Sequence, residues 1–177
     1  MRWMLIVVGA IGAIAVLALV IGWTLPVRHV ASRSASFSAS PESVWRAITD
    51  VDAFPSWRKD VRKIERLPDR DGRAVWVEEG NNGRLRFAVE SSEPPRMLIT
   101  RIDDPSLPFG GAWVYEIAPA GDGCTLTITE QGEIYNPIFR LMARFVFGYE
   151  ATMNAYLDSL KKTLLEKSAW ATTQRVR

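Results

Sequence analysis

The first pattern along the chain is an unbroken apolar segment near its beginning. Residues 3–27 contain no charged side chain, and a bilayer core of about 30 Å requires about 20 such residues in a helix. Trp3 and Trp23 lie near the two ends of the segment, where indole rings prefer the headgroup region. The pattern predicts a single-pass transmembrane anchor with its juxtamembrane linker over residues 1–29.

Two properties of this segment stay open at the level of sequence. A cleaved secretory signal is the alternative to an anchor, although its apolar region usually has about 7 to 15 residues and this one is longer. The charges that flank the segment, Arg2 on one side and Arg28 and Arg33 on the other, do not decide which side of the membrane the remaining chain occupies. We therefore predict the membrane bilayer as a partner and leave the topology and the oligomeric state open.

After the anchor, about 150 residues remain, which is the usual size of one domain. Residues 30–37 are small and compatible with a strand. Ser40, Pro41 and Glu42 then form a strong helix start, because Ser caps the first N–H groups, Pro suits the first position and an acidic residue suits the first turn. We expect a helix to about Asp50, followed by a second short helical turn.

Six stretches of strand length follow, separated by turns rich in Gly, Asn, Asp and Pro. Their short spacing favours antiparallel hairpins over parallel crossovers. The predicted strands cover residues 61–67, 73–79, 84–91, 96–102, 112–118 and 125–134. The longer connection at 103–111 has two prolines and two glycines, and we expect it to be mobile.

Asn136 and Pro137 open the last element, in which apolar residues recur with a helical period. A continuous helix of about 30 residues would be about 45 Å long, and its single apolar stripe would have to pack on the sheet. Residues 169–177 show no such pattern and are expected to form a flexible tail. The stripe comprises Ile138, Leu141, Met142, Phe145, Tyr149, Met153, Tyr156, Leu160 and Leu164.

Two stretches carry a resemblance to a known family: SPESVWRAITDVDAFPSWRKDV at 40–61 and TLTITEQGEIYNPIFRLMARFVFGYEATMNAYLDSL at 125–160. They resemble the START-like, or SRPBCC, superfamily, in its polyketide cyclase/dehydrase and lipid transport branch. The resemblance implies an α+β helix-grip fold over residues 30–168, in which a curved antiparallel β-sheet surrounds a long C-terminal helix. The predicted transmembrane helix precedes that domain. Members of the superfamily share a cavity and not a catalytic constellation.

In such a fold, the stripe on the last helix either belongs to the core or forms a cavity wall. As wall residues we predict Phe145, Tyr149, Met153 and Tyr156, followed by Met142. Methionine adapts to irregular ligands, and tyrosine adds a polar tip to an apolar ring.

The strands add two further candidates for ligand binding. Leu126, Ile128 and Glu130 alternate toward one face, so Glu130 points inward if the first two do. An inward Glu130 would orient a ligand or serve as the structural partner of a buried Arg or Tyr. Tyr115 shares a face with Trp113 and is the second candidate.

Charge and composition exclude several functions. The 22 basic and 20 acidic residues give a net charge of only +2, too little for general nucleic-acid binding. One cysteine, Cys124, leaves no intrachain disulfide. The single histidine, His29, is expected to lie at the membrane exit before the fold begins, which removes triad catalysis and zinc sites. We therefore expect no metal and no cofactor.

These observations predict a membrane-anchored protein that binds or transfers a hydrophobic, lipid-like small molecule in a cavity between the sheet and the C-terminal helix. The 103–111 loop and the start of the last helix would act as a lid. The alternative is a polyketide cyclase, aromatase or dehydratase that uses cavity acids and bases, for which Glu130, Glu116, Tyr115 and Tyr149 are conceivable groups. A third hypothesis is a scaffold whose core is filled by its own side chains, and the volume of the cavity separates it from the other two.

Overall fold

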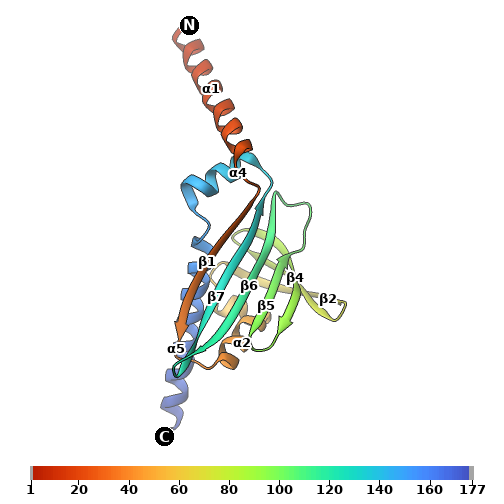
Figure 1. The fold of residues 1–177 in the computed structure, drawn as a ribbon, viewed down its shortest axis with the longest axis vertical. Coiled ribbons are helices and arrows are strands. Elements are labelled where there is room, and N and C mark those ends of the chain that lie inside the picture. The colour runs from red at the N-terminus through yellow and green to blue at the C-terminus, as the bar shows by residue number, and fades with distance from the viewer. Residues whose placement is uncertain (1, 176–177) are drawn as a thin grey trace.

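The computed structural model describes residues 2–175, and one seven-stranded sheet lies at its centre (Figure 1). All neighbouring strands pair antiparallel, in the order β1-β7-β6-β5-β4-β3-β2. The six predicted strands are confirmed, each with bounds close to those expected. The strands are β1 (Arg28–Phe37), β2 (Val61–Arg70), β3 (Arg73–Gly80), β4 (Gly83–Glu93), β5 (Met97–Ile102), β6 (Phe109–Ala120) and β7 (Gly123–Ile134).

Helices flank this sheet. The predicted start at Ser40 is confirmed, since its hydroxyl accepts the N–H of Ser43 at 3.3 Å as an N-cap. Figure 1 shows α5 running alongside the sheet and α1 leaving the domain at the end opposite the C-terminus. This is the helix-grip architecture that the sequence predicts. The helical elements are α1 (Arg2–Thr24), α2 (Pro41–Thr49), η1 (Val51–Ala53), α3 (Phe54–Trp57), α4 (Pro137–Met142), η2 (Ala143–Phe147) and α5 (Ala151–Arg175).

The core lies between the sheet and the helices α2, α3 and α5. Leu126 and Ile128 are fully buried on β7, two residues apart and therefore on one face of the strand. Met153 and Leu160 of α5 and Val44 of α2 meet them and are equally buried. These contacts fix α5 against the sheet and define the inner face on which a cavity can form.

The prediction of one continuous helix from Pro137 onward is wrong. Helix α4 ends at Met142 and continues as a π-helical turn, η2, and the chain then breaks at Gly148, whose φ is +71°. Glycine adopts this left-handed backbone without the Cβ clash that other residues meet. Helix α5 begins only at Ala151 and is helical through Arg175, so the flexibility of a tail at 169–177 stays a prediction, and residues 176–177 lie outside the described residues.

Two further boundaries differ from expectation. Strand β1 begins at Arg28, so His29 is part of the sheet. Strand β6 begins at Phe109, which shortens the preceding connection to residues 103–108. Asp103, at the start of that connection, binds Arg70 at 2.8 Å and Arg86 at 3.1 Å. The mobility of the connection stays a prediction.

Within the described part of the chain, α1 is the one helix long and apolar enough to cross a membrane, with a mean hydropathy of 3.0. A signal sequence near the N-terminus would satisfy the same criteria. The last turn of α1 rests on α4: a Cβ added to Gly22 would lie 2.2 Å from the carbonyl oxygen of Pro137. Just beyond α1, the Leu25 carbonyl accepts a hydrogen bond from Arg140 Nη1 at 2.6 Å.

Candidate ligand-binding cavity

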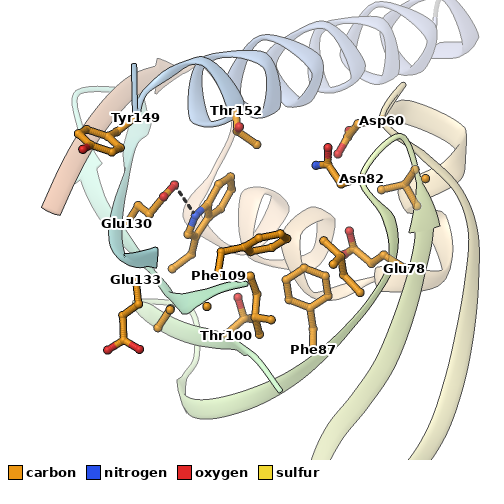
Figure 2. Close-up of a pocket in the computed structure, with 18 of the residues that line it drawn as sticks. Asp60, Glu78, Asn82, Phe87, Thr100, Phe109, Glu130, Glu133, Tyr149 and Thr152 are labelled. Carbon is orange, nitrogen blue, oxygen red and sulfur yellow. Dashed lines mark hydrogen bonds between the residues drawn. The ribbon is translucent and has the colours of Figure 1, made fainter. Parts of the chain in front are cut away.

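A cavity of about 380 Å³ lies between the sheet and the start of α5. In Figure 2, Thr152 of α5 points into it from one side, while Phe87, Thr100 and Phe109 rise from the strands on the other. The volume falls in the range of about 300–1,000 Å³ that is common for small-molecule sites. A scaffold whose core is filled by its own side chains would not leave this space, so the cavity argues against the scaffold hypothesis.

The middle of the cavity is apolar. Leu85 and Phe87 lie two residues apart on β4 and so face the same side of the strand. The rings of Trp76 and Phe87 stack with centroids 5.7 Å apart, which fixes both side chains in the wall. Ile102, Phe109 and Trp113 extend this surface across β5 and β6.

The side chains at the rim indicate where the cavity opens. Asn82, in the turn between β3 and β4, and Gly83, the first residue of β4, are exposed and line the cavity. Gly148, between η2 and α5, and Thr152, in the first turn of α5, are exposed lining residues on the facing side. The opening therefore lies between this turn and the break that separates η2 from α5.

One end of the cavity holds a polar cluster built around Glu130. Its Oε1 lies 3.0 Å from His29 Nε2, and its Oε2 accepts the indole N–H of Trp113 at 3.0 Å (Figure 2, dashed line). The ring of Tyr149 stacks on the imidazole with centroids 3.9 Å apart. Both carboxylate oxygens are thus engaged by cavity-wall groups, and an imidazole and a carboxylate share the surface that a ligand would touch.

The position of His29 follows from the pairing of β1 with β7. His29 lies opposite Gly132, and a Cβ on Gly132 would lie 2.2 Å from the imidazole Cε1. Glycine at this position therefore leaves the room that the ring occupies. The interpretation that His29 lies before the fold is wrong, because the strand extends two residues further back than residues 30–37.

A second polar cluster, formed by Arg58, Asp60, Glu78 and Trp76, lies at the other end of the cavity. Arg58 donates to Glu78 Oε1 at 2.9 Å and to Asp60 Oδ2 at 2.6 Å. The indole N–H of Trp76 donates to the same Glu78 oxygen at 3.1 Å. The guanidinium also lies over the rings of Phe54, at 5.0 Å, and of Tyr156, at 5.4 Å. The two charged side chains Arg58 and Glu78 are therefore buried as one hydrogen-bonded unit.

Burial and neighbouring charges shift the pKa values of Arg58 and of Tyr115, whose hydroxyl lies within the electrostatic reach of this cluster. Burial by itself would lower the pKa of Arg58, but the hydrogen bond to Asp60 and the charge of Glu78 outweigh it and raise the pKa above the ordinary value. Burial raises the pKa of Tyr115 as well. Arg58 thus stays charged, and Tyr115 presents a protonated hydroxyl on the cavity wall.

The structure places three of the predicted site residues, Tyr115, Glu130 and Tyr149, in the cavity lining. Met153 and Tyr156 are buried in the core beneath it. The other two candidates are displaced by the break at Gly148, since α4 and η2 do not continue the axis of α5. Phe145 is 67% exposed, and Met142 is half-buried outside the lining. A role of these seven residues in ligand binding stays a prediction.

Sequence reasoning missed His29, Arg58 and Glu78. His29 gave no local signal, because the alternation of exposed and more covered side chains over residues 28–37 is seen only in the folded strand and does not follow an alternation of apolar and polar residue types. Arg58 gave no local signal, since it lies in a basic run that also suits a solvated strand edge. Among the described residues, no three His, Cys, Asp or Glu side chains gather as a metal site would require.

Chemically, the arrangement can enclose an apolar body and contact polar groups at both of its ends. The His29–Glu130 pair could transfer a proton to or from a bound molecule. No Ser or Cys is among the described side chains that line the cavity, so a serine or cysteine nucleophile has no place in this wall.

Residues 28–165 match the family described as polyketide cyclase/dehydrase and lipid transport. No curated protein sequence matches the chain.

Solved structures of similar fold include enzymes. The di-domain aromatase/cyclase StfQ from the steffimycin biosynthetic pathway is 13% identical with a TM-score of 0.65, and the match covers 81% of this chain but only 53% of that one. The Zhui aromatase/cyclase from Streptomyces sp. R1128 is 12% identical with a TM-score of 0.65, covering 80% and 96%. Norcoclaurine synthase from Thalictrum flavum is 12% identical with a TM-score of 0.63, covering 79% and 88%. At these identities, the likeness concerns the fold alone.

Proposed function

This chain belongs to the polyketide cyclase/dehydrase and lipid transport family, and on that premise we propose that α1 crosses a membrane and that the cavity beside it binds a hydrophobic small molecule. The observation that carries the proposal is the cavity of about 380 Å³, apolar in its middle and polar at both ends. Family membership and the long apolar helix support it.

The volume limits the size of the enclosed part of the ligand. Since a water molecule's share of liquid volume is about 30 Å³ and a methylene group is of similar size, 380 Å³ holds about a dozen non-hydrogen atoms. A two-ring molecule, or the end of a longer lipid chain, fits this space. We therefore propose that a long lipid would extend through the opening between the β3–β4 turn and Gly148.

The ends of the cavity favour a ligand with polar atoms separated by an apolar body. Trp113 and His29 are held by Glu130, while Arg58 is held by Asp60 and Glu78, so each polar group is already oriented before a ligand arrives. Preorganisation of this kind lowers the cost of ordering side chains on binding.

Native mass spectrometry of the full chain, extracted from membranes in detergent, tests the proposal. The wild type should carry a bound small molecule. Thr152→Trp should lose it, because Thr152 lines the cavity from an exposed helical position. Ala155→Trp is the matched control, since Ala155 is exposed on the same helix and outside the lining. A wild type without any bound molecule, or equal occupancy in both variants, would contradict the proposal.

A second candidate function, acid–base catalysis on the bound molecule, is supported by the His29–Glu130 contact at 3.0 Å inside the cavity. Glu130→Gln keeps the shape of the side chain and removes its charge. If the protein is an enzyme, the molecules recovered from this variant and from the wild type should differ: in mass where water is lost, or in chromatographic retention and fragmentation where the reaction is an isomerisation such as a cyclisation. Identical mass, retention and fragmentation at equal occupancy favour a binding protein without turnover.

A further inference from the structure

The exposed apolar side chains of the domain are not scattered over its surface. In the described part of the domain, from residue 28 onward, five of the seven large hydrophobic residues that are exposed lie between Tyr135 and Val146. Isolated exposed apolar residues are ordinary, but a cluster of this kind indicates an interaction surface. We call four of them the α4–η2 patch: Ile138, Phe139, Phe145 and Val146, which are 46%, 48%, 67% and 61% exposed.

The patch is joined to the end of α1 by close contacts, without a flexible linker between them. Gly22 approaches the backbone of Pro137 so closely that a Cβ has no room. The buried Arg140 donates to the Leu25 carbonyl at 2.6 Å. Figure 1 shows α4 lying across the base of α1. If α1 crosses a bilayer, α4 and η2 are therefore held at the level where the helix leaves the hydrocarbon.

The same segment forms part of the cavity wall. Ala143 of η2 and Gly148 beyond it line the cavity, whereas Phe145 and Val146 of η2 are exposed. One short segment thus presents one side to the ligand space and the other to the surroundings. Trp23, near the end of α1, is 74% exposed, and indole is a side chain that favours the membrane interface.

From these contacts we propose that the α4–η2 patch inserts into the headgroup region of the same bilayer that α1 crosses and separates the cavity from the lipid. This inference rests on the proposed function only for the membrane position of α1. The occupant of the patch is the lipid surface. A second copy of the chain or a partner protein is not required, because the anchor already brings the bilayer to the patch.

Labelled full-length protein in vesicles tests the proposal. Single variants Phe145→Cys and Val146→Cys are labelled with an environment-sensitive nitrobenzoxadiazole dye, with Asp122→Cys as the exposed control in the β6–β7 turn. The native Cys124 is buried and should remain unlabelled. The vesicles contain phosphatidylcholine and phosphatidylglycerol, with or without brominated acyl chains that quench the dye on contact.

We expect blue-shifted emission and bromolipid quenching at positions 145 and 146, and neither at position 122. Trp23→Cys serves as the reference for the end of α1. Quenching at 23 but not at 145 and 146 overturns the proposal, as does a blue shift that depends on protein density and not on bromolipid, which would indicate a second copy. Absence of quenching at 23 overturns it together with the membrane position of α1.

The failure of this inference is distinguishable from the failure of ligand binding. If native mass spectra show a bound molecule but labels at 145 and 146 are not quenched, insertion of the α4–η2 patch is refuted and ligand binding in the cavity stands. If the labels are quenched but no molecule is bound, insertion stands and ligand binding is refuted. A further variant, Phe145→Ser with Val146→Ser, should lose the blue shift of a label at Ile138→Cys, while its circular dichroism spectrum should match that of the wild type.

Discussion

Replacing Arg58 by Met should destabilise the domain strongly, because it leaves a buried carboxylate without its cation. Arg58 makes hydrogen bonds of 2.9 Å to Glu78 and 2.6 Å to Asp60. Only 8% of the Glu78 side chain is exposed, against 41% of Asp60. After the replacement, water can solvate the charge of Asp60 but not that of Glu78, so most of the lost stability comes from the uncompensated charge of Glu78.

The magnitude follows from that difference. Removing one partner of a buried ion pair costs about 3–5 kcal/mol. The indole N–H of Trp76 still donates to Glu78 after the replacement and offsets part of this loss. We therefore expect Arg58→Met to lower the free energy of unfolding by about 3 kcal/mol. Asp60→Asn, at a half-exposed position, should cost no more than about 1 kcal/mol.

Denaturant unfolding of the full chain in detergent, followed by tryptophan fluorescence, measures these differences from the transition midpoints at a common slope. The double variant Arg58→Met with Glu78→Gln removes the stranded charge and should recover about 1–2 kcal/mol relative to Arg58→Met alone. The reasoning fails if the double variant is no more stable than Arg58→Met, or if Arg58→Met costs less than Asp60→Asn.

Three smaller predictions concern other parts of the domain. Met153→Ala, at a core position with 0% exposure, should cost about 2–5 kcal/mol in the same unfolding experiment; a loss below that of Ser40→Ala would show that the site is not tightly packed. Ser40→Ala removes the N-cap of α2 and should cost about 1 kcal/mol, whereas Ser40→Asp should retain stability. The hydrogen bond from Arg70 holds the pKa of Asp103 in the folded protein below its ordinary value. The ionised carboxylate therefore stabilises the fold at any pH above the ordinary pKa of an aspartate, and this stabilisation is lost as the pH falls through the lower pKa of the folded state. Asp103→Asn should therefore lower the melting temperature slightly at neutral pH and leave it unchanged in strong acid; an equal difference at both pH values would contradict this linkage.

Much of the fold could be predicted from local signals. The hairpin strands are delimited by turns such as Asp71–Gly72, where both residues have positive φ, and such turns are encoded by two or three adjacent residues. The capped start of α2 is equally local. The continuity of the last helix was mispredicted because apolar residues keep a helical period across Gly148, and one glycine was the only local sign of the break.

The site was less predictable because it depends on pairing between distant segments. His29 reaches the cavity only through the register of β1 with β7, opposite Gly132. Glu78 meets Arg58 only because β3 folds back on β2. A period of two places Glu130 on the inner face, as predicted, but it does not identify His29 and Trp113 as its partners.

The passage from α1 to β1 has a mechanical consequence. Only residues 25–27 separate Thr24 from Arg28, and at about 3.6 Å for each step the extended chain spans at most about 14 Å. With α1 in a bilayer, so short a connection keeps the domain at the membrane surface beside its own anchor. If the cavity holds a ligand as proposed, the domain would bind and release that ligand close to its own anchor, and delivery to a second membrane would require that membrane to approach.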